Sequence, residues 1–265
     1  MFIDTHSHIY AEEFDNDRDE VIEFAIQAGI SKILLPAIDN ESHDRQEALA
    51  SSHPHLFAQM MGLHPTSVGE NPSLELDEAR RRLFANPDKY VAIGEIGLDF
   101  YWDTTFKSQQ IYALGIQFDW AAELQKPVAL HLRNSKDNSV EHNAYTTLFN
   151  IINQRGGNPC RGVLHCFSGT LHDALHAINL GFLLGIGGVV TYKKNTLADI
   201  VDAVPLSSLV LETDAPYLAP SPHRGKRNES AFVTLVAQKI AEIKGIPLSQ
   251  VARITSDNAT RLFNL

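Results

Sequence analysis

The sequence predicts one α/β domain folded as a closed (β/α)8 barrel, a TIM barrel, with an extra C-terminal helix. Three observations support this prediction. Eight short apolar runs alternate with helix-forming segments along nearly the whole chain. The 265 residues are enough for eight such units. No linker, low-complexity stretch or internal repeat interrupts them, so we interpret residues 1–265 as a single domain.

The eight predicted strands are short, apolar and bounded by glycine, proline or aspartate, as is typical of parallel strands that are covered on both faces. They are Phe2–Asp4, Lys32–Ala37, Phe57–Leu63, Tyr90–Gly94, Pro127–Leu132, Gly162–Phe167, Phe182–Gly185 and Ser208–Thr213. A doubly wound open sheet could contain the same strands and is the alternative architecture.

Helices are predicted between the strands from apolar stripes and from stop signals. Asp17–Ala28 places four apolar residues on one stripe. Glycine or proline follows the last apolar position of most of the others. The other predicted helices are Ser73–Phe84, Phe106–Gln125, Asn143–Gln154, Leu171–Asn179 and Glu229–Lys244, and Ser249–Leu262 is the extra C-terminal helix.

The composition excludes several classes of protein. Lys and Arg number 22 and Asp and Glu 32, so the net charge is −10 and a broadly basic surface for nucleic-acid phosphates is absent. Cys160 and Cys166 are the only cysteines, which argues against a disulfide framework. The sequence shows no signal peptide and no apolar run of about 18 residues, so we expect a cytoplasmic protein without a membrane span. No obligate protein partner is indicated.

Polar side chains gather where the predicted strands end, and 12 histidines are present in the chain. The carboxyl ends of barrel strands converge on one mouth. A single histidine at a strand end is often only a hydrogen-bonded residue. Six residues of metal-binding types at the ends of five strands favour a metal site instead. His6 and His8 are two positions apart and therefore point to the same side of an extended chain. The six are His6, His8, Glu95, His131, His165 and Asp214.

At these residues the chain resembles the TatD family of metal-dependent deoxyribonucleases, which are amidohydrolase-like barrels. The resemblance runs from residues 2–8 (FIDTHSH) to residues 258–263 (NATRLF). It is most specific at residues 92–99 (AIGEIGLD), 164–169 (LHCFSG) and 212–220 (ETDAPYLAP), and residues 223–229 (HRGKRNE) match a further family stretch.

The resemblance implies two metal positions that share one carboxylate. His6, His8, Glu95 and Asp214 would hold one ion, and Glu95, His131 and His165 the second. It also implies a phosphodiesterase, typically a 3′→5′ exonuclease that acts on the ends of single-stranded DNA and sometimes on RNA. The donor types accept magnesium, manganese or zinc and do not select among them.

The expected chemistry is hydrolysis by water that is activated on one or two divalent ions. Asp214 is the expected general base, and Glu95 takes part as the bridging ligand. Glu212 lies two positions before Asp214 and points the same way in an extended strand. It either shares the base role or orients a metal ligand.

Substrate-binding residues are expected around the same mouth. His64 donates to a phosphate or caps the turn that begins at Pro65. Arg133 clamps a phosphate or forms an ordinary salt bridge. The basic run that contains His223, Arg224 and Lys226 steers a nucleic-acid backbone or is a solvated loop.

Three further expectations concern neighbouring residues. The aromatic run from Phe100 to Trp102 stacks an unpaired base or packs in the core. Cys166 is a buried apolar residue that faces away from His165, because adjacent strand residues point to opposite faces. The histidines outside the predicted site, His43 among them, are exposed to solvent.

Two other functions remain as alternatives to a DNA exonuclease. The first is a metal-dependent ester or amide hydrolase of a small molecule, because one barrel hosts many reactions. The acidic net charge and departures from the family pattern at Tyr10 and Asn134 leave room for it. The second is a metal-binding protein without catalysis, against which the complete set of six ligands argues.

Overall fold

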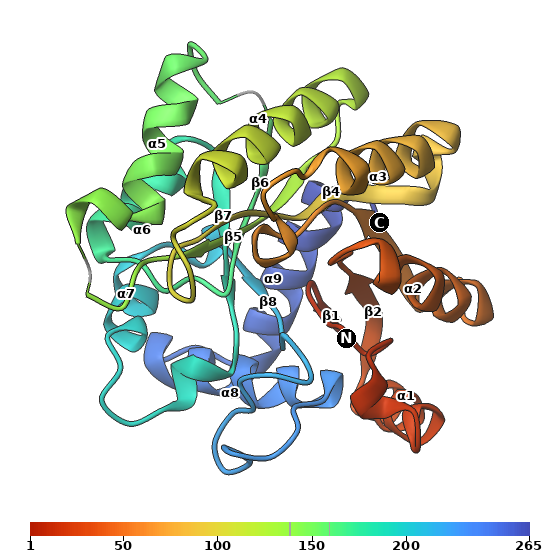
Figure 1. Ribbon diagram of the computed structural model, residues 1–265. Helices are drawn as coiled ribbons and strands as arrows, with labels where there is room; N and C mark the ends of the chain where they lie inside the picture. Colours follow the sequence, from red (N-terminus) through yellow and green to blue (C-terminus); the bar gives the residue numbers. More distant parts are fainter. Residues whose placement is uncertain (138, 159) are drawn as a thin grey trace.

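The computed structural model describes residues 1–137, 139–158 and 160–265 and contains one sheet of eight parallel strands in sequential order (Figure 1). The backbone amide of Thr5 donates to the carbonyl of Leu211 at 2.9 Å, and Ser7 bridges Ala215 in parallel. These contacts join the first strand to the last, so the sheet closes into the predicted barrel rather than remaining open. The strands are β1 Phe2–Asp4, β2 Ile30–Leu35, β3 Phe57–Met61, β4 Tyr90–Asp99, β5 Val128–Arg133, β6 Gly162–His165, β7 Phe182–Ile186 and β8 Leu209–Leu211.

Strand β4 is longer than the sequence predicts, because it continues past Gly94 to Asp99 and pairs there with β5. Gly97 makes this pairing possible. Its φ is +146°, and a Cβ at this position would lie 2.0 Å from the carbonyl oxygen of His131. The extension carries Glu95 and Asp99 to the carboxyl end of the barrel, where the other polar strand ends lie.

Helices surround the barrel, and the seven predicted ones are present within one or two residues at most ends (Figure 1). Two further helices, α2 and α7, fall in segments that the sequence patterns do not assign. No helix in the described ranges is long and apolar enough to cross a membrane. The helices are α1 Arg18–Gln27, α2 Asn40–Ser52, α3 Ser73–Ala85, α4 Lys107–Leu124, α5 Ala144–Gln154, α6 Leu171–Asn179, α7 Leu197–Ala203, α8 Val233–Lys244 and α9 Leu248–Phe263.

The face of α2 that packs toward the sheet is partly polar. Helix α2 begins with a capping box, in which the Asp39 side chain accepts from the backbone amide of Ser42. Gln46 lies on the buried face and donates to the carbonyls of Leu35 and Met60. His43 lies on the same face and is only 1% exposed, so the expectation that it is exposed to solvent is wrong.

The C-terminal helix α9 covers the end of the barrel opposite to the polar strand ends. Asn258 donates to the carbonyls of Leu206 and Leu209, at the start of β8, and Ser256 donates to the carbonyl of Met1. Leu262 and Phe263 belong to an apolar cluster that takes one buried residue from each of seven strands. The helix therefore closes the bottom of the barrel and leaves the carboxyl ends of the strands free for the site.

Candidate metal centre

The carboxylate of Glu95 lies at the centre of the six predicted ligands and is 2% exposed. Its Oε2 atom is 3.0 Å from Nε2 of His6 and 3.5 Å from Nε2 of His8. Its Oε1 atom is 3.0 Å from Nδ1 of His131 and 3.7 Å from Nε2 of His165. Oε1 also faces His64 at 3.2 Å, so each oxygen meets a different set of imidazoles, as a ligand shared by two ions would.

The first group consists of His6, His8 and Asp214, whose ligand atoms all lie within 4.8 Å of one another. Asp214 Oδ1 is 3.6 Å from Nε2 of His8 and 4.0 Å from Nε2 of His6. Donors bound about 2.1 Å from one ion lie roughly 3 Å or a little more apart, so this spacing suits a shared cation.

Tyr10 fixes the tautomer of His8. The Tyr10 hydroxyl donates to the carbonyl of Pro36 at 2.7 Å and lies 2.9 Å from Nδ1 of His8. Because its proton is already used, the hydroxyl accepts from Nδ1–H, which leaves the lone pair on Nε2 for a metal. The sequence motifs identify Tyr10 only as a departure from the family pattern and do not show this role.

Asp4 joins the two strand ends that carry this first group. It is fully buried and accepts from the amide of Thr213 at 2.9 Å, from its hydroxyl at 2.6 Å and from the amide of His6 at 3.3 Å. The amide of Asp214 in turn donates to the carbonyl of His6. Asp214 itself adopts a left-handed backbone conformation with φ +60°, which these contacts hold in place.

The second group contains His131 and His64 beside Oε1 of Glu95. His131 also places Nε2 2.8 Å from Oδ2 of Asp99. His64 Nε2 lies 3.2 Å from Oε1 of Glu95, and its Nδ1 accepts from the amide of Thr66. The proton of the neutral His64 ring is therefore on Nε2, which makes this atom a hydrogen-bond donor rather than a metal ligand.

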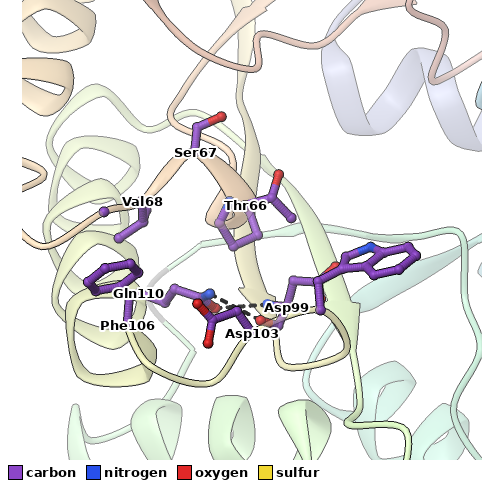
Figure 2. A pocket seen from close by; sticks show the side chains of 10 residues that line it. Thr66, Ser67, Val68, Asp99, Asp103, Phe106 and Gln110 are labelled. Carbon is purple, nitrogen blue, oxygen red and sulfur yellow. Dashed lines mark hydrogen bonds between the residues drawn. The ribbon is translucent and has the colours of Figure 1, made fainter.

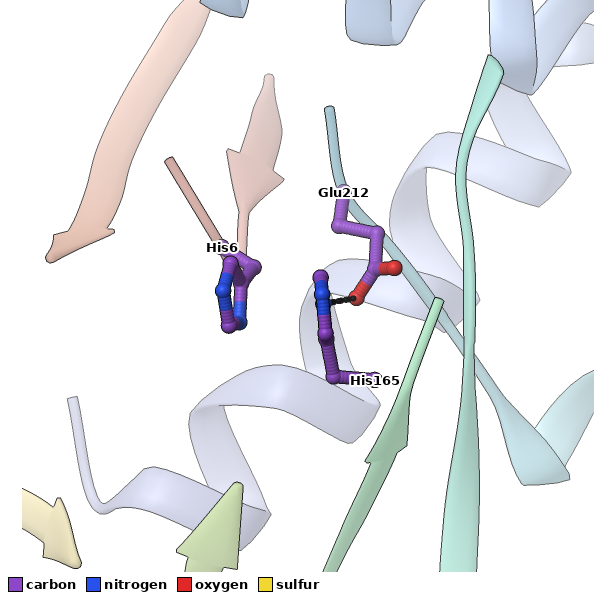
Figure 3. Close-up of side chains that lie close together, drawn as sticks. All are labelled: His6, His165 and Glu212. Carbon is purple, nitrogen blue, oxygen red and sulfur yellow. Dashed lines mark ion pairs between the residues drawn. The ribbon is translucent and has the colours of Figure 1, made fainter. Parts of the chain in front are cut away.

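Glu212 lies against His165 (Figure 3). Its Oε2 atom is 3.2 Å from Nδ1 of His165, and Oε1 accepts from the backbone amide of Cys166 at 2.6 Å. The other ring nitrogen of His165, Nε2, is 3.7 Å from Asp214 Oδ1. Glu212 is fully buried, and this position favours the role of orienting a ligand over the role of a base.

The expectation for Cys166 is wrong. This residue follows the end of β6 with φ +46°, a left-handed conformation that breaks the alternation of a strand. Its sulfur lies within 4.8 Å of ligand atoms of His165 and Asp214, and the residue is partly exposed rather than buried. Partial removal of the thiol from water and the nearby carboxylates of Asp214, Glu212 and Glu95 raise its pKa well above the ordinary value.

The electrostatics of the site favour a bound cation. Burial raises the pKa of Asp214 to about 6. Burial alone would raise the pKa of Glu95, but the surrounding imidazoles hold it well below its ordinary value. Burial alone would lower the pKa of His165, but the nearby carboxylates raise it to about 10. Within the described residues, neither Glu95 nor Asp214 has a lysine or arginine partner. Buried carboxylates that face only imidazoles fit one or two divalent ions.

The predicted substrate-binding cations lie outside this cluster. Arg133, at the end of β5, stacks its guanidinium 3.8 Å from the ring centre of Tyr101. In the loop after β8, Arg224 lies over Tyr192, His223 stacks on Phe232 and Lys226 is exposed. In the described part of the chain, none of the four is bonded or ion-paired to a predicted metal ligand, although both segments follow strands at the same end of the barrel.

Comparison with known proteins agrees with this geometry. Residues 3–264 match the family model described as TatD related DNase. The chain shares 34% identity with the uncharacterized metal-dependent hydrolase YabD of Bacillus subtilis. The alignment spans 266 residues and covers both proteins completely. It is 34% identical over 259 residues, with 96% of each protein covered, to the 3'-5' ssDNA/RNA exonuclease TatD of Erwinia tasmaniensis.

A solved structure shows the same fold. The crystal structure of YjjV, a TatD homologue from Escherichia coli, superposes with a TM-score of 0.87 at 32% identity and covers 100% of this chain and 98% of its own. The family match spans nearly the whole sequence, and the six predicted ligands converge at one end of the barrel. The chain therefore belongs to the TatD family and is a metal-dependent hydrolase.

Proposed function

We propose that the protein hydrolyses phosphodiester bonds at the ends of nucleic acids, as a 3′→5′ exonuclease on single-stranded DNA with RNA as a second substrate. The observation that carries the proposal is the position of Glu95, whose two carboxylate oxygens face separate sets of histidines, His6 and His8 on one side and His64, His131 and His165 on the other. Sites of this kind hold two ions that stabilise the attacking and leaving oxygens of a phosphate. The name of the Erwinia relative supports the same substrate.

Each group of residues has a distinct task in this proposal. One ion would be held by His6, His8, Glu95 and Asp214, and a second by Glu95, His131 and His165. Magnesium, manganese or zinc bound there would polarise a phosphoryl oxygen and lower the pKa of water. Glu212 would keep the ring of His165 in position.

Asp214 is the residue that would accept the proton of the attacking water. Its side chain is 15% exposed, whereas Glu95 and Glu212 are almost or completely buried. It is therefore the carboxylate that a water molecule beside a bound phosphate reaches. His64 would donate from Nε2 to a phosphate oxygen, because its Nδ1 already accepts from Thr66.

Substrate binding would depend on local positive charge, since the whole chain is acidic. Arg133 lies on the rim at the end of β5, and His223, Arg224 and Lys226 lie in the loop after β8. We assign these residues to the sugar-phosphate backbone on either side of the mouth. Weaker binding at higher salt is the expected signature of such contacts.

The test begins with protein that has been treated with a chelator and reloaded with magnesium, manganese or zinc. Each form is incubated with single-stranded DNA labelled at its 5′ end, and with RNA of the same sequence. Stepwise shortening that needs metal and is lost in Glu95→Ala supports the proposal. Glu123→Ala, on the exposed side of α4, is the matched control and should cleave normally.

Two outcomes would contradict the proposal. Release of nucleotides from the 5′ end would exclude the stated polarity. No cleavage of DNA or RNA by protein that demonstrably holds metal would exclude a nuclease, and ester and amide substrates would then be tested on the same preparation.

A further inference from the structure

We propose that a pocket beside the metal centre binds one unpaired nucleobase of the substrate, stacked against the side chain of Trp102. The pocket has a volume of about 260 Å³ and lies between the loop after β3 and the loop after β4 (Figure 2). This volume is below the about 300–1,000 Å³ of sites for drug-sized ligands, so it suits a single base. The role rests on the proposed function, because a base reaches this pocket only when the cleaved bond belongs to a nucleic acid.

Both walls of the pocket touch the metal centre. Thr66, on one wall, contacts Nδ1 of His64, whose other ring nitrogen lies 3.2 Å from Glu95. Asp99, on the other wall, lies 2.8 Å from Nε2 of His131. One side chain therefore separates each wall from the bridging carboxylate. A phosphate held at the metal centre would place an adjoining base at the opening of the pocket.

The lining suits a base and disfavours a phosphate. Pro65, Val68 and Phe106 contribute apolar surface. The carboxylates of Asp99 and Asp103 repel a phosphate, and Asp103 can accept from the amino group of a base. Gln110 fixes the wall, because its amide accepts from the amide of Asp99 and donates to the carbonyl of the same residue (Figure 2). The pocket is thus shaped before a ligand arrives.

Trp102 provides the flat surface. The aromatic run after β4 is divided, since Phe100 is buried in the core and Trp102 is 67% exposed. Tyr101 packs edge to face against the indole, with ring centres 5.0 Å apart. Arg133 and Lys136 lie 5.4 and 4.9 Å from the indole centre, and neither lines the pocket.

This arrangement makes Trp102 a supported platform rather than a loose side chain. Two cations hold the ring through cation–π contacts outside the pocket, and the indole also borders the cavity itself. The same two cations would attract the phosphates on either side of a stacked base. Stacking of a base on an aromatic side chain strengthens binding by about 5- to 140-fold.

The chain allows a direct optical test, because Trp102 and Trp120 are its only tryptophans and Trp120 is 4% exposed. In the variant Trp120→Phe, the remaining fluorescence reports on Trp102 alone. We expect saturable quenching by deoxyadenosine 5′-monophosphate and binding at least 10-fold weaker by deoxyribose 5-phosphate, in which a hydroxyl replaces the base. Calorimetry on Trp102→Ala should show equal affinity for the two compounds. Trp102→Phe should restore most of the difference in affinity between them.

Tyr112→Ala is the matched control, since it removes an exposed aromatic side chain from the middle of α4. Equal binding of the two compounds by the native protein, or an unchanged preference in Trp102→Ala, would overturn the proposal. The metal-loaded protein is assayed on single-stranded DNA in parallel. Base-dependent binding without hydrolysis would refute the proposed function alone, and hydrolysis without base-dependent binding would refute the pocket alone.

Discussion

Glu212 Oε2 lies 3.2 Å from Nδ1 of His165, and the space for this contact exists because residue 185 is glycine. A Cβ at Gly185 would lie 2.2 Å from the same oxygen, far inside van der Waals contact. β7 therefore makes room for a carboxylate that comes from the segment after β8 and supports a histidine from β6. The orientation of His165, a predicted metal ligand, thus depends on a residue that carries no functional group.

Gly185→Ala is expected to weaken metal binding by about 10- to 100-fold, the range for losing a carboxylate that supports a metal-binding histidine. The new methyl group would displace Glu212 from His165 without changing any ionisable residue. Glu212→Gln should have an effect in the same direction. Competition with a chromophoric chelator measures the affinity. Gly115→Ala in α4 is the control, and wild-type affinity in Gly185→Ala would contradict the role assigned to Glu212.

Tyr10→Phe is expected to weaken metal binding by about 10-fold or more, because Nδ1–H of His8 would lose its acceptor. The ring would then adopt the other tautomer more often, with its proton on Nε2. Metal affinity and the pH at which binding is half-maximal provide the measurement. An affinity equal to that of the native protein would show that His8 is fixed by other contacts.

Metal should raise the unfolding temperature of chelator-treated protein. At a free concentration of about 100 times the dissociation constant, one ion adds about 2.7 kcal/mol to the free energy of unfolding. In a chain of this size that corresponds to a rise of about 5 °C or more. Differential scanning calorimetry checks the value, and the rise should be largely lost in Glu95→Ala. An equal rise in that variant would place the bound ion away from Glu95.

His43 should make stability depend on pH. Burial lowers its pKa from the ordinary value of 6.5, while the unfolded chain keeps a pKa near that value. The unfolded state therefore binds the proton more readily, and the free energy of unfolding falls as the pH decreases below about 6.5, by at most about 1.4 kcal/mol per pH unit.

Urea unfolding of chelator-treated protein between pH 7 and pH 5 tests this dependence. His43→Gln should lose less stability than the native protein over this interval. His55→Gln, which changes an exposed histidine, should follow the native curve. Parallel curves for the native protein and His43→Gln would mean that the ring is protonated as easily in the folded state as in the unfolded one.

The strands were predictable because each one is covered on both faces, so its residues form a continuous apolar run. Helix α2 escaped prediction for the opposite reason. Its segment is rich in polar residues, and its buried face includes His43 and Gln46 beside Leu49. Helix α7 has only seven residues, which is too short for an apolar period to be recognised.

The convergence of the six predicted ligands was predictable because parallel strands bring their carboxyl ends together, and these residues stand at those ends. What the sequence could not show depends on backbone angles and on packing between distant segments. Cys166 turns toward the site only because its φ is +46°. The tasks of Tyr10 and Glu212 follow from hydrogen bonds and ion pairs to other strands, whose geometry no local pattern specifies.

The contacts between His6 and Asp214 also constrain when the site can form during synthesis. The two residues are 208 positions apart, and the amide of Asp214 donates to the carbonyl of His6. A chain that emerges from the ribosome N-terminus first carries His6 and His8 long before their carboxylate partner exists. Nascent chains that end before residue 214 should therefore not retain the ion assigned to His6, His8, Glu95 and Asp214, and uptake of that ion should mark the moment at which the ring of strands is completed.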